Sequence, residues 1–162
     1  VGDWVEIDDQ YGQITRVSFR STRFLSLDGR TLVMPNTSML NSRLANHSTN
    51  PKNRVDISIG ISYMSSIDKA REVLLGLVKD DKRVCAEPPP QVVVTNCAAS
   101  SVDLALWLWI DEEKYEKYLY YEYLEKAKKA LDAAGVIIPF PHLQLFLEDT
   151  PALRLLAERK TG

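Results

Sequence analysis

The sequence contains no apolar stretch long enough to cross a bilayer. Its longest uninterrupted apolar run, Leu104 to Ile110, has seven residues, whereas a membrane-spanning helix needs about 20. The chain starts at Val1 without a methionine and leads directly into strand-like sequence, with neither a signal peptide nor an amphipathic leader. We therefore expect it to be part of a longer protein, about whose membrane segments this stretch says little.

Cysteine and histidine are scarce. The cysteines are Cys85 and Cys97, the histidines are His47 and His142, and no C-x-x-C pair occurs. Neither histidine has a Cys, His or carboxylate at ligand spacing, so the sequence predicts no metal site. We expect free thiols in a reducing compartment, and histidines that are structural or solvent-facing.

An excess of one charge is also missing. The chain has 20 Lys and Arg against 22 Asp and Glu, a net charge of −2 and a pI near 5.7. Because phosphate-binding proteins normally carry a basic excess, we expect no nucleic-acid partner. Residues 1–54 alone carry seven basic and five acidic side chains, a difference of +2 that is compatible with facing anionic headgroups.

The motifs of common enzymes are absent. The sequence has no G-x-x-x-x-G-K-[ST], G-x-G-x-x-G or G-x-S-x-G, and these motifs form phosphate cradles and nucleophile elbows. Its neighbouring carboxylates, such as Asp8-Asp9 and Asp80-Asp81, point in different directions in a strand or a helix and make poor acid/base pairs. We therefore predict no catalytic residue, no cofactor and no enzymatic activity.

Residues 1–50 show the pattern of short strands separated by turns. Val5 and Ile7 alternate with polar neighbours, and Asp28-Gly29 lies between two apolar runs, which predicts a hairpin with a type I′ turn. Four or five strands in this length predict a small β-barrel, whose closure removes exposed strand edges. After Pro35-Asn36, apolar residues recur at helical spacing up to Ser48.

A polar segment with a proline, residues 48–54, marks the boundary to a second domain, residues 54–149. Residues 55–63 alternate as a half-buried strand, and a helix with a Ser65 capping box follows. Two strands then flank residues 96–101, a helix over about 113–134 ends at Gly135, and a last strand covers 143–147. This β-α-β-β-α-β order predicts a ferredoxin-like fold. Residues 150–162 form a tail in which a leucine stripe predicts a short helix.

The ordered motifs resemble those of the small-conductance mechanosensitive channel (MscS-like) family over nearly the whole chain. The first 48 residues contain a Gly-Asp-x-Val opening, an Asp-Gly hairpin, a Pro-Asn turn and an Asn-x-Ser close; residues 131–141 contain Ala-Gly followed by apolar residues and Pro-aromatic-Pro. The motif positions are Gly2, Asp3, Gly12, Asp28, Gly29, Pro35, Asn36, Asn46, Gly135, Pro139 and Pro141.

The resemblance implies an Sm-like β domain followed by an α/β domain. It also implies a homo-oligomer, typically a heptamer, whose β domains form a ring beneath the inner membrane and whose α/β domains enclose a cytoplasmic vestibule with side portals. Inorganic ions and small osmolytes would pass through it during osmotic downshock, and upstream transmembrane helices absent from this sequence would hold the gate.

Two groups of residues are candidates for that role. Polar residues near the domain boundary are predicted to line an ion path: Asn50, Lys52, Asn53, Arg54 and Asp56. Tyrosines on more than one face of the second helix are predicted to contact a neighbouring subunit: Tyr115, Tyr118, Tyr121 and Tyr123. A solvated linker and a well-filled core explain the same residues without any such role.

A second hypothesis comes from another class of protein. Small barrels bind single-stranded RNA through basic grooves with stacking aromatic rings. An RNA-binding or ligand-sensing regulator would use side chains of the first domain: Arg16, Phe19, Arg20, Arg23 and Phe24.

Overall fold

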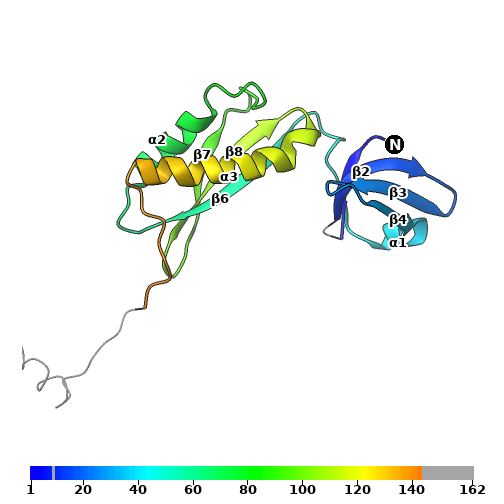
Figure 1. Cartoon of the computed structure of the whole chain (residues 1–162), viewed down its shortest axis with the longest axis horizontal. Coiled ribbons are helices and arrows are strands. Elements are labelled where there is room, and N and C mark those ends of the chain that lie inside the picture. The colour runs from blue at the N-terminus through cyan, green and yellow to red at the C-terminus, as the bar shows by residue number, and fades with distance from the viewer. Residues whose placement is uncertain (9, 144–162) are drawn as a thin grey trace, which may run out of the picture.

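The computed structural model describes residues 1–8 and 10–143, which fold into two units joined by a connector, residues 47–52 (Figure 1). The first unit is a sheet with one short helix, and the second is a sheet with two longer helices. We call them the β domain and the α/β domain.

The β domain is an antiparallel five-stranded sheet in the order β4-β3-β2-β1-β5. Its elements are β1 (Trp4–Ile7), β2 (Gln10–Val17), β3 (Ser21–Ser26), β4 (Thr31–Pro35), α1 (Asn36–Asn41) and β5 (Leu44–Asn46). Val5, Ile7 and Phe24 are fully buried at its centre, and Ile14, Leu32, Met34 and Met39 pack around them. The alternation of Val5 and Ile7 with polar neighbours therefore predicted β1 and its buried face correctly.

Gly12 allows β2 and β3 to approach closely. A Cβ atom at this position would lie 2.6 Å from the Leu25 carbonyl oxygen and 3.0 Å from the Phe24 ring. Any larger residue would push the central strands apart, because backbone cannot move aside as a flexible side chain can.

The sheet does not close into the predicted barrel. Among residues 1–8 and 10–143, no strand pairing joins β4 to β5. These two strands are therefore edges of the sheet as described, each with a row of backbone N–H and C=O groups that pair with no other described strand.

Two local predictions in this domain are wrong. The turn at Asp28-Gly29 has a positive φ only at Gly29, with Gly29 N–H donating to the Ser26 carbonyl and Ser26 N–H donating to the Arg30 carbonyl. This geometry fits a type I turn with a glycine bulge better than type I′. The helix after Pro35 also ends early, because Ser42 is extended and residues 44–46 pair with β1 as a strand.

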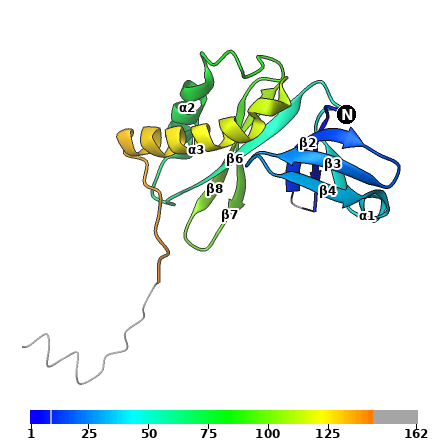
Figure 2. The same cartoon turned by 45° about the vertical axis from the view of Figure 1, so that its right-hand side comes forward.

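The α/β domain places two helices on one face of a three-stranded antiparallel sheet, ordered β6-β8-β7 (Figures 1 and 2). Its elements are β6 (Asn53–Ile61), α2 (Ile67–Val78), β7 (Gln91–Cys97), β8 (Val102–Ile110), the 3-10 turn η1 (Glu113–Tyr115) and α3 (Glu116–Ala133). The alternating residues of β6 and β8 form the core with the helix stripes, including Ile57, Ile61, Leu106, Leu74 and Leu131. Burial of each such side chain contributes about 1.5–3 kcal/mol.

Hydrogen bonds cap the N-terminus of α2 and the C-terminus of α3. The N-cap of α2 is Ser66, whose hydroxyl accepts a hydrogen bond from the Lys69 N–H at 3.3 Å; the predicted Ser65 instead accepts one from Ile137 N–H. Helix α3 ends at Gly135, which has φ of 70°. Gly135 N–H donates to the Asp132 carbonyl and Val136 N–H to the Leu131 carbonyl, so the predicted glycine cap forms a Schellman motif.

The order β-α-β-β-α is observed over residues 53–133. The predicted last strand, apart from Leu143, and the tail at 150–162 lie outside the described residues. Leu143 itself is not in a strand.

We predict that Gly135→Val lowers the free energy of unfolding of the α/β domain by about 1 kcal/mol or more, because a β-branched residue resists a positive φ. A Cβ atom there would meet nothing within 4 Å, so the loss measures backbone strain alone. Gly76→Ala is the matched control: Gly76 lies inside α2 in equally open space, and alanine should raise stability by about 0.5–1 kcal/mol. Chemical denaturation measures both, and an unchanged Gly135→Val variant would contradict the cap.

Candidate functional site at the domain junction

The connector carries several of the residues predicted to line an ion path. Asn50 and Lys52 are exposed, and the Lys52 ammonium donates a hydrogen bond to the Glu87 carbonyl oxygen. The Asn53 amide donates to the His47 carbonyl oxygen. One of these bonds joins the end of the connector to residue 87, and the other joins its start to Asn53, which directly follows the connector.

Arg54 and Asp56 form a charged strip on the sheet face opposite the helices. The Arg54 Nε and Nη2 atoms donate to the two carboxylate oxygens of Asp56 at 2.6 and 2.8 Å. The guanidinium also lies 4.2 Å from the centre of the Trp107 ring, in a cation–π contact. Both side chains are partly exposed, as those of Asn50 and Lys52 are.

The two domains meet through aromatic and charged side chains that sequence reasoning did not connect. We call them the junction cluster: Trp4, Glu6, Tyr11, His47, Glu113, Glu116 and Lys117. Residues from β1, β2 and the connector form one side, and residues from η1 and α3 form the other.

The carboxylate of Glu116 is the centre of the cluster. Its Oε2 atom lies 3.0 Å from His47 Nδ1 and 3.3 Å from the Tyr11 hydroxyl. The same hydroxyl lies 3.3 Å from the Glu113 carbonyl oxygen. Lys117 Nζ lies 5.0 Å from the centre of the Tyr11 ring. The start of α3 thus contacts Tyr11 of the β domain and His47 of the connector.

Backbone and side-chain bonds to β1 position His47. The His47 N–H donates to the Trp4 carbonyl at 2.9 Å, and the Ser48 hydroxyl accepts from the Trp4 N–H at 2.9 Å. The Asn46 amide donates to the Asp3 carboxylate at 3.0 Å. The Asn46-His47-Ser48 motif therefore fastens the end of the β domain to its first strand and aims the histidine at the α/β domain.

Charge and burial shift the titration of two groups in the cluster. The hydrogen bond with Glu116 raises the pKa of His47, and the charges of Glu116 and Glu6 act in the same direction against the opposing effect of burial. Burial, followed by the Glu116 charge, raises the pKa of the Tyr11 hydroxyl above its ordinary range. At neutral pH Tyr11 therefore stays a hydrogen-bond donor.

A hollow of about 500 Å³ lies beside the cluster and is lined by Glu6, Asp8, Arg43, Ala45 and His47. Its lining mixes both signs of charge. In the described part of the chain, no three His, Cys, Asp or Glu side chains are arranged to hold a metal ion, and no helix there is long and apolar enough to span a membrane.

The tyrosines predicted to contact a neighbouring subunit differ in exposure. Tyr118 and Tyr121 expose 61% and 65% of their surface, and Tyr115 is half-buried against the core. Tyr123 is fully buried and has no surface to offer a partner, because it falls on the same helix stripe as Leu119 and Ala127. The prediction for Tyr123 is therefore corrected.

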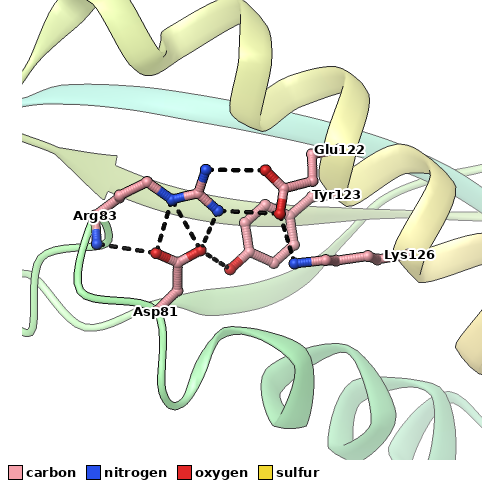
Figure 3. A network of polar contacts seen from close by, with 5 residues as sticks. All are labelled: Asp81, Arg83, Glu122, Tyr123 and Lys126. Atoms are coloured by element: carbon pink, nitrogen blue, oxygen red, sulfur yellow. Dashed lines mark hydrogen bonds and ion pairs between the residues drawn. The ribbon is translucent and has the colours of Figure 1, made fainter.

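Tyr123 belongs instead to a polar network that ties the segment after α2 to α3 (Figure 3). Its hydroxyl donates to Asp81 Oδ2 at 2.9 Å. Arg83 bridges Asp81 at 2.6 Å and Glu122 at 2.9 Å, and Lys126 pairs with Glu122 at 2.6 Å. The Arg83 hydrogen bonds hold the pKa of Asp81 well below its usual range, so its carboxylate stays ionised at neutral pH.

Comparison with known families matches both domains. Residues 1–49 match the family described as "Mechanosensitive ion channel, beta-domain", and residues 55–138 match "Mechanosensitive ion channel MscS, C-terminal". The chain belongs to the MscS family of mechanosensitive ion channels. This is a channel family rather than an enzyme family, and the resemblance drawn from the ordered motifs is confirmed.

Individual MscS-family proteins are similar over most of the chain. The small-conductance mechanosensitive channel of Edwardsiella ictaluri is 30% identical over 146 residues, which cover 90% of this chain and 51% of that protein. The closed-state crystal structure of Helicobacter pylori MscS aligns with 26% identity and a TM-score of 0.77, over 92% of this chain and 59% of that one. Escherichia coli MscK is 34% identical over 113 residues, 69% of this chain and 10% of MscK. The chain thus spans about half the length of the first two.

In this MscS-family chain, the asparagine of the Pro-Asn motif forms hydrogen bonds to the turn between β2 and β3. The Asn36 amide nitrogen donates to the Ser18 carbonyl at 2.9 Å, and the Thr22 hydroxyl donates to the Asn36 side-chain oxygen at 2.9 Å. The Asn36 N–H donates to the Arg20 carbonyl at 3.0 Å. Asn36 thereby fixes the β2–β3 turn.

The two motif prolines near the end of the described chain, Pro139 and Pro141, follow α3 in a segment without helix or strand.

We predict that Tyr123→Phe lowers the free energy of unfolding by about 1–2 kcal/mol, because the partly buried Asp81 carboxylate loses a hydrogen-bond donor. Tyr121→Phe is the matched control, since its ring is exposed and the change should cost less than about 0.5 kcal/mol. Urea denaturation followed by circular dichroism compares the two. Equal effects would show that the hydrogen bond from the Tyr123 hydroxyl to Asp81 (Figure 3) adds nothing to stability.

Proposed function

We propose that this chain is the soluble region of a mechanosensitive channel subunit, with an Sm-like β domain and a ferredoxin-like α/β domain. Identical copies, most simply seven, form a ring and a vestibule on the cytoplasmic side of the inner membrane. Ions and small osmolytes pass through this vestibule when an osmotic downshock opens the pore. The chain carries no catalytic function in this role.

The observation that carries this proposal is the match of both channel domains in order along the chain. The two edges of the β sheet support it. Strands β4 and β5 lie at opposite edges of one sheet, so the β4 edge of one copy can pair with the β5 edge of the next. Such head-to-tail contacts use two different surfaces and form a ring when the rotation from one copy to the next closes on itself.

Exposed apolar side chains after α3 also support the proposed assembly. Ile137, Phe140 and Leu143 expose 59%, 85% and 81% of their surface. A segment this apolar is normally covered by a partner, and the seven-fold axis brings identical segments of all copies together.

The RNA-binding hypothesis loses part of its basis. Phe24 is 1% exposed and cannot stack on a base. Phe19 is 95% exposed, but one exposed ring beside Arg16, Arg20 and Arg23 does not make the row of stacking platforms that single-stranded nucleic acid requires. We therefore do not propose it.

The ring model predicts that Val33→Lys weakens self-association of the chain at least tenfold, because a lysine on edge strand β4 opposes pairing with another strand. Val17→Lys is the matched control: Val17 is 57% and Val33 58% exposed, but Val17 lies on β2, inside the sheet. Native mass spectrometry over a concentration series gives the oligomeric state. A parent chain that stays monomeric at all concentrations, or equal effects of both lysines, would count against pairing through β4.

We expect the full-length parent protein, expressed in cells that lack their own mechanosensitive channels, to give a current in membrane patches when tension is applied. The parent gene should encode at least one apolar helix of about 20 residues ahead of Val1; a gene without one would refute the proposal.

The candidate ion path makes a further prediction for that protein. Lys52→Glu should shift the reversal potential in a salt gradient toward cation preference, because the ring repeats the charge around the axis. Lys69→Glu makes the same charge change on α2, away from the connector, and should leave the potential unchanged. Identical potentials for both variants would remove Lys52 from the path.

A further inference from the structure

A single histidine lies between the two domains, and few other side chains hold them together. Within the described residues, the hydrogen bonds, ion pairs and ring contacts that join the β strands of the first domain to η1 and α3 all involve Tyr11 or His47. No apolar core is shared, because the two buried clusters contain residues of one domain each. The relative orientation of the domains therefore depends on a small polar contact.

The two ring nitrogens of His47 face different carboxylates. Nδ1 lies 3.0 Å from Glu116 of α3, and Nε2 lies 3.8 Å from Glu6 of β1. Nε2 is buried and has no hydrogen-bond partner. Only the protonated ring carries an N–H on both nitrogens, so protonation serves both carboxylates at once, whereas the neutral ring leaves one nitrogen without a proton.

Acidic groups outnumber basic ones around the ring. The titratable and charged groups that face it or line the adjoining hollow are Glu6, Asp8, Tyr11, Arg43, Glu113, Glu116 and Lys117. The side chains of His47 and Glu116 are only 20% and 12% exposed, so solvent screens their interaction less than it screens a surface pair. The charge of Lys117 lowers the pKa of His47, but its effect is smaller than that of the hydrogen bond with Glu116.

We propose that His47 is a proton-operated latch between the β domain and the α/β domain: the protonated ring joins Glu116 to Glu6 and holds the domains in the arrangement of Figure 1, and the neutral ring releases them. The latch is a property of this chain alone. Any effect of the latch on ion passage would act through the connector, whose first residue, His47, accepts a hydrogen bond from the Asn53 amide at its carbonyl oxygen. That effect rests on the proposed function.

The direction of the pH dependence follows from linkage. His47 in an undocked chain titrates near its ordinary value of about 6.5, and in the docked chain its pKa is raised. The added stability of the docked state is therefore complete below about pH 6.5 and is lost as the pH rises through the raised value. Alkaline conditions loosen the junction, and acidification tightens it.

The first test measures the protonation of His47 in the 162-residue chain by NMR titration of its ring protons. We expect a midpoint above about 6.5, and Glu116→Gln should lower it by about 1. Glu125→Gln is the matched control, since Glu125 is an exposed carboxylate on the same helix, paired with Lys129. A His47 midpoint at or below 6.5, or one that Glu116→Gln leaves in place, would overturn the latch.

The second test measures domain orientation. Spin labels on Thr31→Cys of β4 and on the exposed Cys97 of β7, in a Cys85→Ser background, report the distance between the domains; dilution with unlabelled chain suppresses distances between copies. We expect one narrow population at about pH 5.5 and a broad one at about pH 9, on either side of the His47 transition.

Two histidine variants decide the assignment. His47→Gln should give the broad distribution at both pH values, whereas His142→Gln, which removes the other histidine of the chain, should behave like the parent. A parent whose distances do not change with pH, or a His47→Gln variant that still switches, would overturn the proposal. Both tests use the isolated chain, so a failure to find channel current in the full-length protein would leave their outcome unaffected.

Discussion

Backbone hydrogen bonding at the sheet edges is the constraint on which this structure depends. Strands β4 and β5 lie at opposite ends of the same sheet, and each has an outer edge that no other strand of the described residues pairs with. Gly12 lets β2 lie close to β3, and Asn36 fixes the turn that precedes β3. A barrel closed within one chain would have no open edges, whereas an open sheet has two edges that other copies can pair with in the proposed ring.

The α/β domain is stabilised in a different way, by a core shared between one sheet face and two helices. The network of Asp81, Arg83, Glu122 and Tyr123 links the segment that follows α2 to the middle of α3. Because this domain has its own core, its link to the β domain can remain small and polar. That separation lets one histidine influence how two rigid parts sit against each other.

Periodicity predicted the parts of the fold that depend on local burial. The alternation of β6 and the stripe of α2 follow directly from their apolar spacing, and Gly135 ends α3 because only a residue tolerant of positive φ fits there. The short strand β5 was missed because the apolar spacing of residues 39–44 also suits a helix, and its strand conformation depends on pairing with β1. Tyr123 was misassigned because, among the several tyrosines in this region, it is the one in α3 that is fully buried in the core. The contact of His47 with Glu116 joins residues far apart in sequence, and no pattern of spacing signals it.

Disulfide trapping at the sheet edges tests the central claim most directly. In a chain without Cys85 and Cys97, the pair Thr31→Cys on β4 and Leu44→Cys on β5 places one thiol on each edge. If copies pair edge to edge in a ring, oxidation produces a ladder of covalent oligomers that stops at a closed species, expected at seven copies. A product that remains monomeric, or a ladder that continues without closing, would contradict the ring.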